Sequence, residues 1–384
     1  MAVHPQLAGF DAAAFLRERW QKKPLLLRDA WVEWANPLDP DELAGLACED
    51  GVESRLVERA GDDWSVAHGP FPEARLESLR RSDWTLLVQA VDQFVPAVAA
   101  LIEPFRFVPD WRIDDVMVSL AANGGGVGPH FDQYDVFLVQ GLGRRRWRIG
   151  PQCDATSALL PHDELRLLAG FEAVEEHVLE PGDILYVPPG VAHDGVAESD
   201  DCMTYSIGFR APSRSELLSH FCDHVVDSLV DDDRYADPDL GRQDNPGEIA
   251  PAALARLQAM ITEAMQDRAA FARWFGAYVT TPKYPELDWA PDEPLVQGEL
   301  RRRLAAGERL CRNPASRFSF VREGANRVLL FVDGQCHACS GKLVRFAESL
   351  CAQDCLVLDD AWLASAEAMA LIGGLVDDGS LVFE

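Results

Sequence analysis

Long apolar stretches and basic residues are what this 384-residue sequence has little of. No apolar run approaches the roughly 20 residues that a membrane-spanning helix needs, and residues 1–10 do not resemble a signal peptide. Only 35 residues are lysine or arginine against 63 aspartates and glutamates, which gives a net charge of −28. Such a surface repels nucleic-acid phosphates and anionic membranes. We therefore expect no direct binding to nucleic acid or membrane.

The nine cysteines are an odd number in a long chain, and this favours free thiols in a reducing cytoplasm. With 48% hydrophobic residues, the chain is long enough to form two or three domains with cores of their own. The acidic charge would attract a basic partner. Acidity can also serve only to keep a protein soluble, and charge alone does not separate these two interpretations.

The middle of the chain has the pattern of an antiparallel β protein. Short apolar stretches alternate with turns rich in glycine and proline, which is typical of a β-sandwich or barrel. The predicted strands are 115–120, 136–140, 145–149, 183–187 and 203–209. A capping box formed by Ser213 and Glu216 then opens a helical region, and a small α/β unit follows from about residue 296.

Two histidines and one aspartate form a candidate metal site. His130 and Asp132 are two positions apart, so in a strand their side chains would face the same side. His193 follows a Pro-Pro-Gly turn after the apolar strand 183–187, and an antiparallel barrel can place it beside the first two. Two imidazoles and one carboxylate are the facial triad of non-haem Fe(II) oxygenases, which leaves positions for a cosubstrate and O2. His-x-Asp alone is a weak signal, and His130 could instead be an ordinary packed histidine.

An arginine-rich stretch, 144–148, follows the strand after this pair. Strand alternation predicts that Arg145 points inward with Trp147, while the other arginines point outward. A 2-oxoglutarate-dependent enzyme needs a cation for the distal carboxylate of that cosubstrate, and arginine provides a bidentate one. The alternative is that the whole stretch is a solvated edge strand.

Four cysteines near the end of the chain could bind zinc, because Cys336 and Cys339 form a Cys-x-x-Cys motif and Cys351 and Cys355 follow. We instead expect residues 334–340 to form a turn before a helix, with Cys351 and Cys355 one turn apart on that helix. They would then be buried as small apolar residues.

Several long motifs resemble the JmjC ribosomal oxygenases, specifically the bacterial ribosomal-protein arginine hydroxylases. The similarity covers about residues 15–215. It is carried by HFDQYDVFLVQGLGRRRW at 130–147, WRIDD at 111–115, GDILYVPPG at 182–190, YSIGFR at 205–210 and KKPL at 22–25.

The resemblance implies an α+β fold with three parts. A double-stranded β-helix (JmjC, cupin-like) catalytic domain would cover 1–211, a helical dimerisation region 212–281, and a winged-helix-like domain 282–384. A homodimer is therefore expected. An apolar face on Leu217, Phe221 and Val225 is consistent with it.

The resemblance also implies roles for single residues. His130, Asp132 and His193 would bind Fe(II), while Arg145 and Ser119 would hold 2-oxoglutarate. The implied substrate is an arginine of large-subunit ribosomal protein sixteen, a basic protein, hydroxylated at the β-carbon. The sequence departs from the family at Thr204, where an asparagine is usual, and a hydroxyl cannot make both contacts of an amide.

A guanidinium substrate needs acidic and aromatic neighbours. The candidates by sequence proximity are Tyr134, Asp135, Asp114 and Asp115, each of which could equally be structural. Two other functions stay open. One is the same chemistry on a histidyl residue, a methyl-lysine or a small molecule, and the other is a non-catalytic cupin-like binding module.

Overall fold

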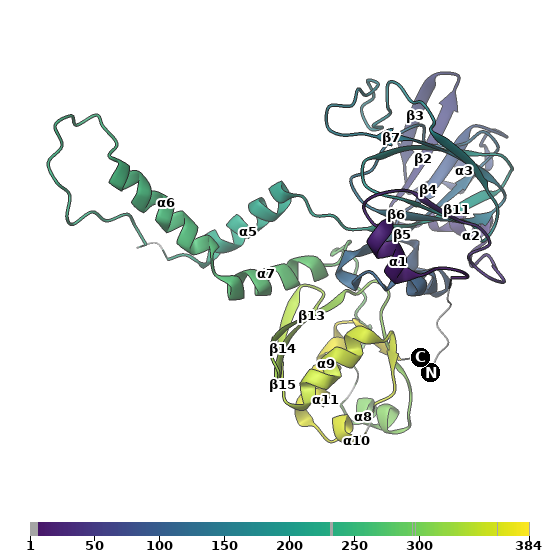
Figure 1. Cartoon of the computed structure of the whole chain (residues 1–384). Helices are drawn as coiled ribbons and strands as arrows, with labels where there is room; N and C mark the ends of the chain where they lie inside the picture. Colours follow the sequence, from purple (N-terminus) through teal and green to yellow (C-terminus); the bar gives the residue numbers. More distant parts are fainter. Residues whose placement is uncertain (1–6, 231–232, 294, 296, 359, 384) are drawn as a thin grey trace. The chain divides into compact units, whose positions relative to one another are not determined.

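The computed structural model describes residues 7–230, 233–293, 295, 297–358 and 360–383, so residues 1–6 of the predicted catalytic domain lie outside it. The chain divides into two compact units (Figure 1). Unit 1 comprises Met1–Ala211 with Asn313–Ala315, and unit 2 comprises Pro212–Arg312 with Ser316–Glu384. Each has a hydrophobic core of its own. In the described residues, no helix is both long and apolar enough to cross a membrane.

Unit 1 is built on two antiparallel sheets. The larger has the strand order β1-β9-β6-β11-β5-β4-β2-β3, and the smaller has the order β10-β7-β8. The strands are β1 (Leu25–Leu27), β2 (Ser54–Ala60), β3 (Asp63–His68), β4 (Trp84–Val88), β5 (Ile113–Ala121), β6 (Val136–Leu142), β7 (Arg145–Gln152), β8 (Glu175–Leu179), β9 (Ile184–Val187), β10 (Val191–Ala197) and β11 (Cys202–Phe209). All five strands predicted from the sequence are confirmed.

The two sheets pack face to face through a shared buried cluster, and the predicted site residues lie on their strands and on the loop before β6. Val136 and Leu138 of the larger sheet share one buried cluster with Trp147 and Ile149 of the smaller sheet. The opposite face of the larger sheet carries the main core, which includes Phe137 and other side chains pointing away from the small sheet. The alternation along β6 therefore divides its side chains between two apolar layers.

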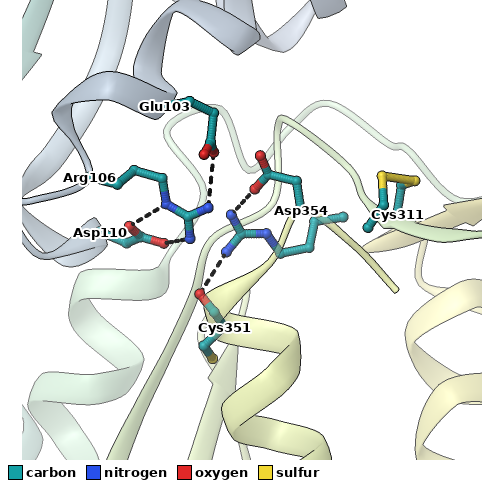
Figure 2. A network of polar contacts seen from close by, with 8 residues as sticks. Glu103, Arg106, Asp110, Cys311, Cys351 and Asp354 are labelled. Atoms are coloured by element: carbon teal, nitrogen blue, oxygen red, sulfur yellow. Dashed lines mark hydrogen bonds and ion pairs between the residues drawn. A yellow bond between two sulfur atoms is a disulfide. The ribbon is translucent and has the colours of Figure 1, made fainter. Parts of the chain in front are cut away.

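Short helices cover the outer core of unit 1. They are α1 (Ala12–Glu18), α2 (Pro40–Leu46), α3 (Glu73–Glu77) and α4 (Pro96–Ala99), with 3-10 turns at Val91–Gln93, Ala100–Phe105 and Asp110–Arg112. Asp11 caps α1, and Asp39 caps α2 in a capping box with Glu42. Arg106 links the last two of these turns, because its guanidinium bonds Glu103 of one and Asp110 of the other (Figure 2).

Unit 2 begins with three helices, α5 (Arg214–Ser228), α6 (Pro251–Met265) and α7 (Arg268–Thr280). The predicted capping box of Ser213 and Glu216 is confirmed at the start of α5. Within the described part of the remaining chain, two three-stranded sheets and four helices follow. They are α8 (Gln297–Ala305), β12 (Leu310–Arg312), β13 (Phe318–Gly324), β14 (Arg327–Val332), β15 (Gln335–Ser340), α9 (Lys342–Ala352), β16 (Cys355–Leu356), α10 (Asp360–Leu363), α11 (Ala366–Asp377) and β17 (Leu381–Phe383), with sheet orders β16-β12-β17 and β13-β14-β15.

The expected turn at residues 334–340 is wrong, because these residues are mostly strand β15. The two-residue loop Asp333-Gly334, with positive φ at both positions, joins β14 to β15 as a hairpin. Asp-Gly is a common sequence for such a loop, because both of its residues must adopt the left-handed conformation. That dipeptide was the signal for the strand.

The cysteine predictions also need correction. Cys355 is not on the helix with Cys351, because α9 ends at Ala352 and Cys355 begins β16. Cys355 lies opposite Cys311 in the β12–β16 pairing, and the two form a disulfide (Figure 2). The expectation that all nine cysteines are free is therefore wrong; the other seven are free.

Candidate functional site

The three predicted metal ligands lie together where the loop before β6 meets strand β10. His130 and His193 exchange two backbone hydrogen bonds, N to O, of 3.0 and 2.8 Å. The backbone carbonyl of Asp132 accepts a bond of 2.7 Å from the N–H of Gly190, in the turn before β10. His130 and Asp132 do not lie in a regular strand as predicted. His130 is an isolated bridge residue and Asp132 belongs to the loop before β6, so the bridge to His193 orients this segment instead.

The side chains of these residues converge. The potential ligand atoms all lie within 4.8 Å of one another, and no other such group of three occurs among the residues that the structure describes. Asp132 Oδ2 is 3.5 Å from His193 Nε2 and 3.9 Å from His130 Nε2. The side chain of His193 is 3% exposed, whereas those of His130 and Asp132 are 23% exposed. The cluster is therefore closed on the His193 side and open on the other.

Backbone carbonyls orient both imidazole rings. Nδ1 of His130 lies 2.8 Å from the carbonyl oxygen of Gly128, and Nδ1 of His193 lies 3.0 Å from that of Val191. If each Nδ1 carries the proton, each Nε2 presents a lone pair toward the cluster. Burial and the neighbouring His130 lower the pKa of His193 to about 4. His193 is then neutral at physiological pH, the form in which imidazole binds a metal.

Arg145 is buried at the start of β7. The burial of β7 alternates, so Arg145 and Trp147 point inward while Arg146 and Arg148 point outward to carboxylates. The predicted alternation is confirmed. The alternative of a solvated edge strand is wrong, because β7 lies between β10 and β8.

The guanidinium of Arg145 has few partners in the described chain. Its Nη2 donates to Ser119 Oγ at 3.5 Å, a weak contact, and its Nε has no hydrogen-bond partner. No described carboxylate forms an ion pair with it, although its side chain is only 4% exposed. A buried, unpaired cation is costly unless an anion compensates it. This site therefore fits a bound carboxylate, and the two-histidine, one-carboxylate set fits Fe(II).

Thr204 lies directly opposite Ser119 in the pairing of β11 with β5. Its hydroxyl donates to Gln140 Oε1 at 3.2 Å, and the amide nitrogen of Gln140 donates to the carbonyl of Met203 at 3.1 Å. Ser119 Oγ also lies 3.5 Å from the carbonyl oxygen of Thr204. The residue that departs from the family pattern is thus adjacent to the candidate cosubstrate site.

The four candidate substrate residues differ in their accessibility to solvent. Tyr134 is 43% exposed. Partial burial raises the pKa of its hydroxyl, and the negative charges of Asp132, Asp115 and Asp114 raise that pKa further. Asp114 is half-buried and forms an ion pair with Arg210 at 3.2 Å. Tyr134 and Asp114 therefore remain accessible from solvent.

Asp135 and Asp115 are buried and bonded within the chain. Asp135 accepts hydrogen bonds from Tyr186 Oη at 2.5 Å and from Gln21 Nε2 at 2.9 Å. Asp115 accepts bonds from the Gln89 side chain at 2.7 Å and from the N–H of Ala90 at 3.0 Å. These contacts join loops to strands. Asp135 and Asp115 therefore have the structural role that the sequence analysis gave as the alternative to substrate binding.

A glycine that the sequence did not single out shapes the site. Gly195 lies opposite Trp147 in the pairing of β10 with β7. A Cβ atom at Gly195 would lie 2.6 Å from atoms of the Trp147 ring, so the indole occupies the space that a side chain would take. A glycine within a strand signals such a close approach, and this signal was present in the sequence.

Comparisons with known proteins agree with this geometry. Residues 100–217 match the JmjC domain family, and residues 263–382 match the ROXA-like winged-helix family. The chain is 45% identical over 299 residues to the ribosomal protein uL16 3-hydroxylase of Escherichia coli, covering 78% of this chain and 79% of that protein. It is 42% identical over 228 residues to a probable ribosomal oxygenase of Haemophilus influenzae, covering 59% and 54%.

A solved structure matches over nearly the whole length. The ribosomal oxygenase YcfD from Escherichia coli, in complex with cobalt and 2-oxoglutarate, superposes with a TM-score of 0.87 at 38% identity. The match covers 99% of each chain. Together with the convergent His-Asp-His cluster, these similarities identify the chain as a member of the JmjC-domain ribosomal oxygenases, metal- and 2-oxoglutarate-dependent enzymes.

Proposed function

We propose that this chain hydroxylates the β-carbon of an arginine in ribosomal protein uL16, with Fe(II) held by His130, Asp132 and His193. The observation that carries the proposal is the pairing of this open ligand cluster with the buried, unpaired guanidinium of Arg145. A metal site and a carboxylate site in the space between the same two sheets are what a 2-oxoglutarate-dependent oxygenase needs.

Each residue has a defined task in this proposal. Arg145 binds the distal carboxylate of 2-oxoglutarate, with Ser119 Oγ beside it. The carbonyls of Gly128 and Val191 keep the two imidazoles in the metal-binding orientation. When bound, Fe(II) and 2-oxoglutarate supply the oxidation by O2, in which succinate and carbon dioxide are released and the substrate carbon gains a hydroxyl. The chain's contribution is to orient both groups and to shield the reacting carbon from water.

The substrate assignment has three supports. The Escherichia coli relative is named as a uL16 3-hydroxylase, and this chain spans 79% of it. The net charge of −28 suits a basic ribosomal protein and disfavours direct contact with nucleic acid. Exposed Tyr134, which lies near Asp132, offers an aromatic ring to a guanidinium group. Half-exposed Asp114, which is paired with Arg210, adds a carboxylate near that ring.

The domain organisation is part of the proposal. We assign residues 1–211 to the catalytic domain, 212–281 to helical dimerisation and 282–384 to the winged-helix-like domain. The face on Leu217, Phe221 and Val225 does not support a homodimer, because Phe221 and Val225 are buried against Trp274 of the same chain. The support comes from α6, where Leu254, Leu257 and Ile261 are 54%, 43% and 69% exposed on one helical face. A protein that modifies a newly made ribosomal protein would work in the cytoplasm.

The proposal is tested with purified protein, Fe(II), 2-oxoglutarate, O2 and uL16. The expected product is uL16 heavier by one oxygen atom, and fragmentation by mass spectrometry should place that oxygen on the β-carbon of an arginine. The Asp132→Ala variant should give no product. An unmodified uL16 together with 2-oxoglutarate turnover would favour another protein residue or a small molecule as substrate. Absence of 2-oxoglutarate binding would instead favour a non-catalytic binding module.

A further inference from the structure

Trp147 lies between the two ends of the candidate cosubstrate site. On β10, His193, Gly195 and Ala197 point to the same face, and they lie opposite Ile149, Trp147 and Arg145 of β7 in that order. With a rise of about 3.3 Å per residue along a strand, Arg145 and His193 are separated by a gap that Trp147 and Gly195 span. A dicarboxylate bound at the metal cluster and at Arg145 must pass along this gap.

The indole ring contacts both ends of the gap. Its centroid is 5.9 Å from the centroid of the His193 ring, and the guanidinium carbon of Arg145 lies 5.8 Å from it. The ring edge formed by Cε3, Cζ3 and Cη2 packs over Gly195. Nε1 belongs to the opposite side of the ring system. The glycine thus leaves room for a flat ring to form one wall of the gap.

The indole N–H of Trp147 lacks a hydrogen-bond acceptor. Trp147 is 6% exposed, and its Nε1 is one of the few buried side-chain atoms in the described residues without a partner. Arg145 Nε, two positions away on the same face of β7, is another. A buried donor without an acceptor is unfavourable, and two such donors on one strand face point to a common anionic ligand.

We propose that Trp147 is a cosubstrate-binding residue, whose ring packs against the carbon chain of 2-oxoglutarate and whose N–H donates to one of its carboxylate oxygens. The inference rests on the proposed function, because it takes 2-oxoglutarate as the ligand. It adds a second donor beside Arg145 and gives Gly195 a role, since a side chain there would push the indole out of position.

The test is calorimetric titration of 2-oxoglutarate into the Mn(II)-loaded protein. Trp147→Phe keeps an aromatic ring but removes the donor, and it should weaken 2-oxoglutarate binding about 10-fold or more, the effect of a hydrogen bond to a charged group. Mn(II) affinity should stay unchanged. Gly195→Ala should weaken 2-oxoglutarate binding as well. The matched control is Trp34→Phe, which removes an indole donor bonded to the Gly141 carbonyl, outside the site.

A second measurement does not depend on the variants folding. In wild-type protein loaded with diamagnetic Zn(II) and carrying 15N-labelled tryptophan, the Trp147 indole N–H resonance should shift when 2-oxoglutarate is added. Equal binding by Trp147→Phe, or an indole resonance that does not move, would overturn the inference and leave the proposed function intact. A wild-type protein that binds no 2-oxoglutarate would overturn both.

Discussion

His130 and His193 lie far apart in the sequence, yet their backbones exchange two hydrogen bonds, N to O, of 3.0 and 2.8 Å. This bridge joins the loop before β6 to strand β10 and holds the two imidazole rings with centroids 4.3 Å apart. The paired backbone thus places the two residues side by side, and the Nδ1 contacts with the Gly128 and Val191 carbonyls orient their rings. A preformed set of ligands lowers the conformational cost of metal binding.

Replacing one ligand should strongly weaken metal binding while the fold survives. In Asp132→Ala, the two imidazoles lose the carboxylate that completes the ligand set. We expect Mn(II) affinity to fall by at least about 100-fold, because loss of a ligand costs more than loss of a residue that only hydrogen-bonds a ligand. Electron paramagnetic resonance of free Mn(II) measures this. His220→Ala, on the exposed surface of α5, serves as the control. A variant at Asp132 that bound Mn(II) as tightly as the wild type would contradict the metal assignment.

Arg145→Met should raise the KM for 2-oxoglutarate by about 10- to 100-fold, because a charge-assisted bidentate contact is lost from a buried site. Steady-state kinetics with varied 2-oxoglutarate measures the change, and the KM for the protein substrate should move little. Arg146→Met is the matched control, since Arg146 points outward to Glu198 and Glu176. If both substitutions had the same effect, general weakening of β7 would explain the result.

Thr204→Asn should strengthen 2-oxoglutarate binding. Thr204 lies opposite Ser119, next to Arg145, and an amide can make one more contact than the hydroxyl. We expect the KM for 2-oxoglutarate to fall about 2- to 10-fold, the effect of one hydrogen bond. An unchanged KM would mean that the bond of Thr204 to Gln140 serves only to pack the strands.

Ile261→Glu should convert the predicted dimer into a monomer. Ile261 is 69% exposed on the apolar face of α6, and a charge buried at an interface is strongly unfavourable. Light scattering after size-exclusion chromatography gives the mass directly. Ala259→Glu adds the same charge on the opposite face of α6 and should leave the dimer intact. A wild-type chain that runs as a monomer would remove the basis of this prediction.

Reduction of the Cys311–Cys355 disulfide should destabilise unit 2. The bond closes a loop with a sequence separation of 44, and a cross-link of this length stabilises a fold by about 2–4 kcal/mol. Thermal unfolding with and without reductant measures the shift. The double variant Cys311→Ser, Cys355→Ser should be insensitive to reductant, and a wild type equally insensitive would show that the bond adds no stability.

Local patterns in the sequence were sufficient for much of the site. Strand alternation placed Arg145 inside and Arg146 outside, because successive side chains of a strand must face opposite sides. A side-chain capping signal, Ser213 with Glu216, located the start of α5. The ligand residues and the family were also recognisable, since they depend on residue type and order.

Other features depend on contacts between distant segments. Nothing local in Asp135 and Asp115 separates a buried carboxylate with hydrogen-bond donors from a surface one, and only the packing of Tyr186 and Gln89 against them decided it. The pairing of Cys311 with Cys355 likewise follows from strand register.

The sequence by itself therefore determined the inward face of β7, the ligand types and the family. Tertiary structure decided how His130 is held, because a bridge to His193 replaces the regular strand that the sequence predicted. It also decided that Trp147 spans the gap between His193 and Arg145, since that depends on the register of β10 against β7. Register is set by the packing of whole sheets, and no short stretch of sequence contains it.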